Sequence, residues 1–332
     1  MKRRQVLHSA GAIAAMGSLG LIRPAFAAAP TMTTVAKIIG VPYFSLLQTG
    51  LVAAGHEFGI ASDMIGPAHV DPAQQVRLVE DTIAKRVDVL GLIPLDVKVL
   101  APVVKRARDA GIIVVTQEGP EMEGRNWDVE MVDSTAFGKE MMKSLARQMD
   151  EKGDYICIVG TLTTPLHNLW CDAAIAYQKK TYPNMRLAAD RFPGADEIDT
   201  TEQVVRTALQ AYPDLRGVIG FGSSGPIGAG NVVRQRRLQA KLSVTGFALP
   251  SQAKPLIDSG ALKEVFLWNP REVGEALVAV ASLVLKNTEF RTGMDIPGIG
   301  KAMVDPDKKI ISVSRMLTLN KQTLPDLLKL GI

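Results

Sequence analysis

The stretch at residues 220–225 (GFGSSG) has a spacing associated with phosphate chemistry. It satisfies G-x-G-x-x-G, a motif whose backbone amides bind a pyrophosphate where a helix begins. Dinucleotide binding also requires an acid about 20 residues further on. The sequence around Thr245 (SVTGFAL) offers none. We therefore interpret 220–225 as a tight turn that presents backbone amides and the hydroxyls of Ser223 and Ser224 to a cleft, and a nucleotide site remains the alternative.

Other catalytic and metal-binding patterns are missing from the sequence. It contains no phosphate-binding loop (G-x-x-x-x-G-K-[ST]), no nucleophile elbow (G-x-S-x-G), no H-E-x-x-H and no C-x-x-C. His56, His69 and His167 are not spaced to share a metal ion. Cys157 and Cys171 are interpreted as buried small hydrophobic residues, with a disulfide between them as the less favoured alternative. We therefore expect no catalytic residue, cofactor or metal.

The excess of positive charge lies entirely at the N-terminus. The chain has 332 residues, of which 38 are Lys or Arg and 34 are Asp or Glu. Residues 1–27 contain four of the basic residues and no acidic one, so the remainder carries 34 of each sign. A body without net charge lacks the field that attracts nucleic acid or an anionic membrane. We therefore expect no nucleic-acid partner.

This N-terminal segment has the three parts of an export signal. Arg3 and Arg4 precede an apolar run at 10–22, and residues 25–27 (AFA) fit the small-x-small rule for cleavage. We predict that 1–27 is a twin-arginine-type signal peptide, cleaved after Ala27, and that the protein acts in the periplasm. The apolar run is too short to span ~30 Å of hydrocarbon comfortably.

The body alternates apolar, β-branched runs with amphipathic helical patterns. Such alternation predicts parallel sheets that are covered by helices on both faces. We expect strands at 35–41, 63–65, 87–93, 112–116, 155–159, 186–189, 217–221, 243–247 and 264–268, and helices at 45–58, 72–85, 97–110, 137–149, 167–181, 197–211, 226–237 and 271–285. The series restarts near 137, so the predicted fold class is α/β with two doubly wound sheets. Ligands of such sheets bind beyond the carboxyl ends of the strands.

The sequence resembles the periplasmic sugar-binding proteins of ABC importers, the type I solute-binding proteins that include ribose-, rhamnose- and autoinducer-2-binding members. The resemblance covers nearly all of the chain after the leader. It is carried, in order, by KIIGVPYF at 37–44, DTIAKRVDVLGLIP at 81–94, ALQAYPDL at 208–215, TGF at 245–247, LW at 267–268 and DIPGIGK at 295–301. The last of these is most similar to the autoinducer-2 and rhamnose branch.

The resemblance also implies which residues contact the ligand. Glu118 stands where the family has a sugar-binding aspartate, and Lys37 where the autoinducer-2 branch has a lysine. The ribose branch has an arginine near His167 and an aspartate at Ser223, so this chain departs from it at both positions. Each candidate could instead be an ordinary surface or core residue. The candidate set is Lys37, Tyr43, Phe44, Gln117, Glu118, His167, Asn168, Ser223, Ser224, Trp268 and Asn269.

The family fold implies two lobes that are joined by three crossovers. We expect the crossovers near 133–135, 267–270 and 296–298. The N-terminal lobe would then be 31–133 plus 269–296, and the C-terminal lobe 134–268 plus 297–332. The implied function is capture of a small sugar or related polyol and delivery to an ABC importer's membrane permease, by a monomer that could also signal through a chemoreceptor. The alternative is an exported NAD(P)-dependent sugar oxidoreductase that uses 220–225.

Overall fold

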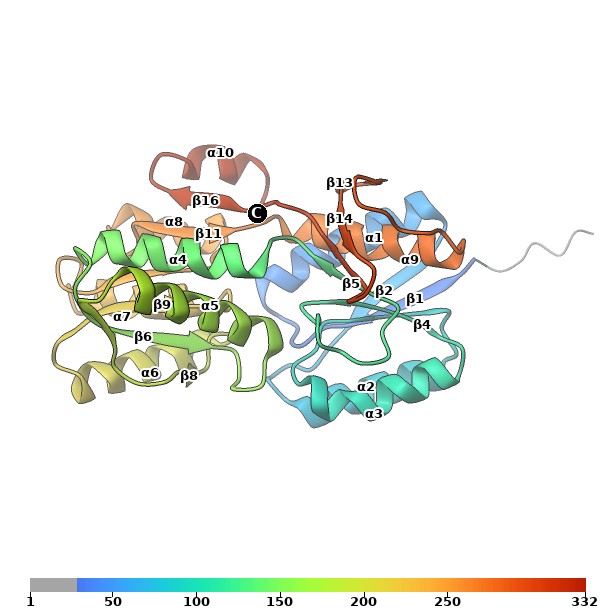
Figure 1. Ribbon diagram of the computed structural model, residues 1–332, viewed down its shortest axis with the longest axis horizontal. Coiled ribbons are helices and arrows are strands. Elements are labelled where there is room, and N and C mark those ends of the chain that lie inside the picture. Colours follow the sequence, from blue (N-terminus) through green and yellow to red (C-terminus); the bar gives the residue numbers. More distant parts are fainter. Residues whose placement is uncertain (1–28) are drawn as a thin grey trace, which may run out of the picture.

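The computed structural model describes residues 29–332 (Figure 1). The expected signal peptide at 1–27 and its cleavage site therefore lie outside the described residues. Figure 1 shows two α/β lobes side by side along the long axis of the molecule, which confirms the predicted fold class.

The first lobe is built on a seven-stranded sheet whose helices cover both faces. Helices α1 (Pro42–Phe58) and α9 (Pro270–Leu285) pack together on one face, and α2 (Pro72–Ala84) and α3 (Val97–Asp109) on the other (Figure 1). All neighbouring strands are parallel except the last pair. In sheet order the strands are β2 (Ala61–Ile65), β1 (Thr31–Val35), β3 (Val89–Leu92), β4 (Ile113–Gln117), β5 (Trp127–Glu130), β15 (Ile310–Ser312) and β14 (Met303–Asp305).

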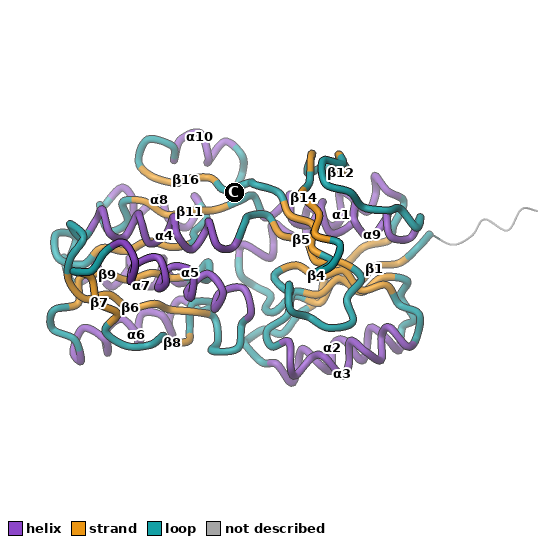
Figure 2. Tube along the Cα trace, viewed as in Figure 1, coloured by secondary structure: helices purple, strands orange, loops and turns teal. Residues whose placement is uncertain are grey.

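The second lobe repeats this plan with a smaller parallel sheet (Figure 2). Its strands are β10 (Ser243–Gly246), β9 (Leu215–Gly220), β6 (Gly153–Val159) and β7 (Met185–Leu187), with β8 (Phe192–Pro193) also paired to β6. Its helices are α4 (Ser134–Gln148), α5 (Pro165–Thr181), α6 (Ile198–Ala211), α7 (Gly225–Gln235) and α8 (Pro250–Asp258). An antiparallel pair, β11 (Glu264–Leu267) and β16 (Leu317–Asn320), and helix α10 (Leu324–Lys329) complete this lobe.

The chain passes between the lobes three times. It crosses after β5, after β11, and between β15 and β16. The predicted third crossover near 296–298 is wrong, because 303–305 and 310–312 still belong to the first sheet. Residues 297–299 instead form the turn of a hairpin between β12 (Asp295–Ile296) and β13 (Gly300–Lys301). Gly298 and Gly300 have φ values of 81° and 80°, which glycine adopts without steric cost.

The first strand lies upstream of the predicted 35–41 segment. The threonine-rich β1 (TMTTV) ends at Val35, and Pro42 begins α1. β-branched residues favour a pleated strand, which explains why TMTTV pairs on both sides. Lys37 therefore does not lie inside a strand as expected. It lies in the loop just beyond the carboxyl end of β1.

A side-chain cap determines where α2 begins, and two glycines determine how closely α1 and α9 pack. The Asp71 side chain accepts a hydrogen bond from Gln74 N–H and so caps the start of α2 at Pro72. Gly50 on α1 and Gly274 on α9 lie on the opposite face of the first sheet from α2. A Cβ at Gly50 would lie 2.0 Å from Arg271 O, and one at Gly274 would lie 2.2 Å from Leu47 O. Only glycine allows α1 and α9 to approach this closely. This close contact holds the start of α9 against α1, just after the chain crosses back into the first lobe.

Candidate ligand-binding site

A small cavity lies between the lobes, where the carboxyl ends of their strands face each other. Its volume is about 20 Å³, enough for about one water molecule. A larger surface hollow of about 670 Å³ lies at the opposite, amino end of the first sheet, around Thr31 and Ala61. Sheets of this kind bind ligands at their carboxyl ends, so the small cavity is the candidate site. It is lined by Lys37, Tyr43, Phe44, Glu118, His167, Trp170, Asp196, Phe221, Ser223, Phe247 and Trp268.

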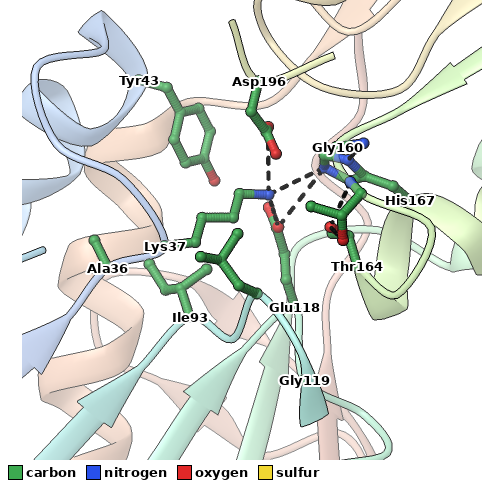
Figure 3. Close-up of polar contacts among 12 residues, drawn as sticks. Ala36, Lys37, Tyr43, Ile93, Glu118, Gly119, Gly160, Thr164, His167 and Asp196 are labelled. Carbon is green, nitrogen blue, oxygen red and sulfur yellow. Dashed lines mark hydrogen bonds and ion pairs between the residues drawn. The ribbon is translucent and has the colours of Figure 1, made fainter. Parts of the chain in front are cut away.

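Four polar side chains meet at the centre of this cavity (Figure 3). Lys37 Nζ lies 2.7 Å from Glu118 Oε2, 3.1 Å from His167 Nε2 and 3.8 Å from Asp196 Oδ1. Lys37 and Glu118 belong to the first lobe, whereas His167 and Asp196 belong to the second. No member of the group is more than 5% exposed. The ammonium group of Lys37 therefore links the two lobes in a setting with little water.

The charges within this group follow from burial and from the neighbours. Burial opposes the charge on Lys37, but the carboxylates of Asp196 and Glu118 outweigh it and raise the pKa of the lysine. Burial, and then the charge on Lys37, lower the pKa of His167 well below its usual value. Burial raises the pKa of Asp196. The site thus combines one ammonium group and two acids with an uncharged imidazole.

Aromatic rings form the walls of the cavity. Trp268 Nε1–H donates to the Tyr43 hydroxyl at 3.2 Å, a contact between the crossover after β11 and the first lobe. The rings of Tyr43 and Phe247 meet edge to face at 5.6 Å, and the Phe247 and Trp268 centroids are 4.5 Å apart. His167 stacks on Trp170. Aromatic faces beside a few fixed polar groups suit a ligand that has both C–H surfaces and hydroxyls.

A buried acidic pair supports the backbone next to Glu118. Asp128 Oδ1 accepts hydrogen bonds from Thr116 Oγ1 at 2.6 Å and from Gly119 N–H at 3.0 Å. This holds the turn in which Glu118 adopts a φ of 59°, a left-handed conformation that costs a non-glycine residue about 1–2 kcal/mol. Glu130 lies two residues beyond Asp128 on β5, so both side chains leave the same face. Among described residues, Asp128 Oδ2 and Glu130 Oε1 have no hydrogen-bond partner.

Replacing Glu130 by glutamine should stabilise the protein increasingly as the pH rises. Burial, and then the charges of Asp128 and Glu118, raise the pKa of Glu130 well above its usual 4.5. The folded state therefore binds this proton more tightly than the unfolded state does, and the wild type loses stability as the pH rises above 4.5. Urea unfolding at pH 4.5 and pH 8 should show a gain for Glu130→Gln at pH 8 above the ~0.5 kcal/mol of a surface exchange. The exposed control Glu289→Gln should show no such trend, and an equal effect at both pH values would contradict the assignment.

Seven of the predicted residues line the cavity. They come from both lobes and follow the ends of strands, as the fold class led us to expect. They are Lys37, Tyr43, Phe44, Glu118, His167, Ser223 and Trp268.

Four predicted residues do not line the cavity, and hydrogen bonds elsewhere hold the side chains of three of them. Asn168 donates to Thr161 O and Thr164 O, and it accepts from Arg191. Asn269 accepts from Arg271 N–H and caps α9. The remaining two are Ser224, which donates to the carbonyl oxygen of Asp196, and Gln117, which is buried with no hydrogen-bond partner for its amide among the described residues.

Four lining residues are absent from the predicted set. Phe221 and Phe247 come directly after β9 and β10, so the rule that ligands bind beyond strand ends would have found them. Trp170 lies three residues after His167 on α5, which places both on the same helix face. The short β8 left no clear sequence pattern, and this concealed Asp196.

The turn at 220–225 does not present its amides to the cavity as predicted. The N–H groups of Phe221, Ser224 and Gly225 donate to Ile158 O, Ala195 O and Gly222 O. A Cβ at Gly222 would lie 2.5 Å from Ala195 O, so this glycine allows close packing against another loop. Three of the amides that a pyrophosphate would need are therefore already bonded within the protein.

The described part of the chain contains no disulfide, no metal-binding cluster and no membrane-spanning helix. Cys157 and Cys171 are buried, free thiols. Across residues 29–332, we find no group of three or more His, Cys, Asp or Glu side chains arranged to hold a metal ion. The same residues include no helix with the length and apolarity needed to cross a membrane.

Solved structures share this architecture. A solute-binding protein of an ABC transporter from Clostridium phytofermentas, with bound L-rhamnose, has a TM-score of 0.83 and 21% identity, over 92% of this chain and 100% of that one. LsrB from Clostridium saccharobutylicum, in complex with AI-2, has a TM-score of 0.81 and 21% identity, over 89% and 99%. At this identity the likeness establishes the fold alone.

Sequence comparison agrees with the structural one. The D-ribose/D-allose-binding protein of Pseudomonas aeruginosa is 25% identical over 240 residues, which are 70% of this chain and 74% of the relative. The periplasmic binding protein domain matches residues 33–289, more than half of the chain and parts of both lobes. The chain therefore belongs to the periplasmic binding protein domain family.

Proposed function

We propose that this protein captures a small uncharged sugar or a related polyol between its lobes and delivers it to the membrane permease of an ABC importer. The observation that carries this proposal is the cavity itself. Both lobes contribute to it, and it combines aromatic walls with buried charged groups that can bond hydroxyls. Relatives whose names specify ribose, allose or L-rhamnose support the same class of ligand.

Binding requires the lobes to separate and close again. The cavity of about 20 Å³ is far smaller than the roughly 300–1,000 Å³ of small-molecule sites. The three crossovers are the points about which the lobes can turn, and closure then traps the ligand. The permease would recognise the closed form. The mobile element is thus a whole lobe and not a short lid.

The oxidoreductase alternative is disfavoured by the turn at 220–225. The amides of Phe221, Ser224 and Gly225 are bonded within the protein, so these three are not free to bind a pyrophosphate. Lys37 is held as an ammonium ion between two acids, so it has no lone pair with which to act as a base.

Location and partners follow from the family and from the leader. Periplasmic binding proteins act in the periplasm, and we propose that residues 1–27 direct export by the twin-arginine route with cleavage after Ala27. We further propose that the protein works as a monomer. A chemoreceptor would be a second partner for the same closed form.

A thermal-shift screen of the purified protein tests this proposal. The panel contains D-ribose, D-allose, D-arabinose, L-rhamnose, a set of polyols, and AI-2. A ligand at 100 times its Kd that binds only the folded state adds about 2.7 kcal/mol of stability, so a true ligand should raise Tm by several degrees. Calorimetric titration of each hit should show saturable binding without turnover. Binding of NAD(P) in place of every sugar would reverse the proposal in favour of the oxidoreductase.

A further inference from the structure

The two ring nitrogens of His167 have different neighbours, and this fixes where its hydrogen lies. Gly160 N–H donates to His167 Nδ1 at 3.0 Å, so Nδ1 must present a lone pair. The hydrogen of the neutral imidazole therefore lies on Nε2. A ring turned by 180° would place a carbon against the Gly160 N–H, so the same bond also sets the ring orientation.

The charges of both partners at Nε2 are also determined by their surroundings. His167 is 2% exposed, and burial and Lys37 keep its pKa well below the usual value. The imidazole is therefore neutral at physiological pH. Lys37 stays protonated, because Glu118 Oε2 and Asp196 Oδ1 lie 2.7 and 3.8 Å from its Nζ.

These assignments place two hydrogen-bond donors against each other. Lys37 Nζ and His167 Nε2 are 3.1 Å apart, yet an ammonium group has no lone pair and Nε2 carries a hydrogen. Glu118 Oε2 lies 3.9 Å from Nε2, beyond hydrogen-bond distance. Among the described residues, no acceptor lies within hydrogen-bond distance of Nε2. An oxygen that lies to one side of the pair, within hydrogen-bond distance of both nitrogens, would accept from both donors.

We propose that His167 Nε2–H and Lys37 Nζ form a two-donor fork that holds one uncharged oxygen of the bound molecule, a hydroxyl or carbonyl oxygen. This rests on the proposed function and specifies the chemistry of its ligand. Glu118 and Asp196 would accept hydrogens from neighbouring hydroxyls of the same molecule. Asp196 Oδ2 is buried and has no partner among the described residues, so it has capacity for one. The fork and the two acids together suit a vicinal diol or an α-hydroxy carbonyl compound.

The same arrangement rejects sugar acids. A ligand carboxylate would be the third acid beside Glu118 and Asp196, and Lys37 is the only cationic side chain among the described residues that line the cavity. A buried charge without a partner costs several kcal/mol. We therefore expect the aldonic acid of any sugar that binds to bind at least 100-fold more weakly than the sugar.

Nitrogen NMR of the imidazole rings tests the fork without any ligand. In the ¹⁵N-labelled protein, the signals of His167 are assigned by their loss in His167→Gln. We expect the neutral Nε2–H form from pH 5.5 to pH 8. The proposal would be overturned by a hydrogen on Nδ1, or by protonation of the ring near pH 6.5. A failure of the sugar screen would leave this result intact, so the two proposals fail separately.

Affinity measurements then test the donor role. D-ribose, D-allose and L-rhamnose are the neutral probes, each paired with its aldonic acid. Glutamine can accept from Gly160 with its carbonyl and donate with its amide, so His167→Gln should keep Kd within about tenfold. His167→Met removes the donor and should weaken binding about tenfold or more. The exposed control His56→Gln should leave Kd unchanged. Wild-type affinity in His167→Met, or equal binding of sugar and acid, would refute the fork.

Discussion

Replacing Lys37 by methionine is expected to destabilise the folded protein by about 3–5 kcal/mol at neutral pH. The ammonium group lies between the buried carboxyl groups of Glu118 and Asp196, 2.7 and 3.8 Å away. Methionine keeps most of the volume but leaves both acids without a cation. Urea unfolding of the variant and the wild type at pH 7 measures the loss.

Three comparisons separate this cause from a simple packing defect. The exposed control Lys105→Met should change stability by less than ~0.5 kcal/mol. The double variant Lys37→Met/Asp196→Asn should recover part of the loss, since one of the unpaired acids is gone. In Lys37→Met the pKa of Asp196 should rise further, so the folded state binds more protons than the unfolded one, and the deficit should shrink as the pH falls toward 4. A loss below 1 kcal/mol, or one independent of pH, would mean that the lobes open and hydrate the acids.

Replacing Glu118 by glutamine is expected to weaken sugar binding by about ten- to a hundredfold while the protein remains folded. A hydrogen bond to a charged group contributes about 1.5–3 kcal/mol, and each 1.4 kcal/mol is tenfold in Kd. Glutamine has nearly the same shape, and Lys37 retains Asp196 as a counter-ion. Calorimetric titration with the sugar that gives the largest thermal shift measures the change.

The matched control is Glu123→Gln, an exposed acid a few residues along the same loop. It removes the same charge without touching the cavity, so its affinity should equal that of the wild type. An unchanged Kd in Glu118→Gln would remove Glu118 from the site. Equal weakening in both variants would instead point to a long-range effect of net charge.

The alternation of strands and helices could be read from the sequence because each element has a strong local pattern. Asp71 followed by Pro72, for example, sets the start of α2 through its own side chain. Candidate site residues could be located because parallel strands deliver their carboxyl ends to one edge. Seven candidates accordingly meet at one cavity, including Lys37 and His167, which are 130 residues apart.

The remaining features depend on tertiary contacts that no local pattern records. Strand β5 has two acids, Asp128 and Glu130, where a buried strand normally has apolar residues, so no local pattern indicates a strand there. The glycines near 298 signal a turn, but a hairpin and a crossover require the same turn chemistry. Asn168 and Ser224 stand beside true lining residues, and only the hydrogen bonds to Thr161 and Asp196 decide which way they face.

Each wall residue of the cavity lies past the end of a strand, on a loop or at a helix start, and outside both sheets. The aromatic walls, such as Phe247, are nevertheless members of the hydrophobic core, whereas Ser223 lines the cavity without belonging to that core. Recognition and folding therefore share the aromatic wall residues. A change of cargo would be tolerated most easily at positions such as Ser223, and the need to keep the lobes packed would limit change at the rings.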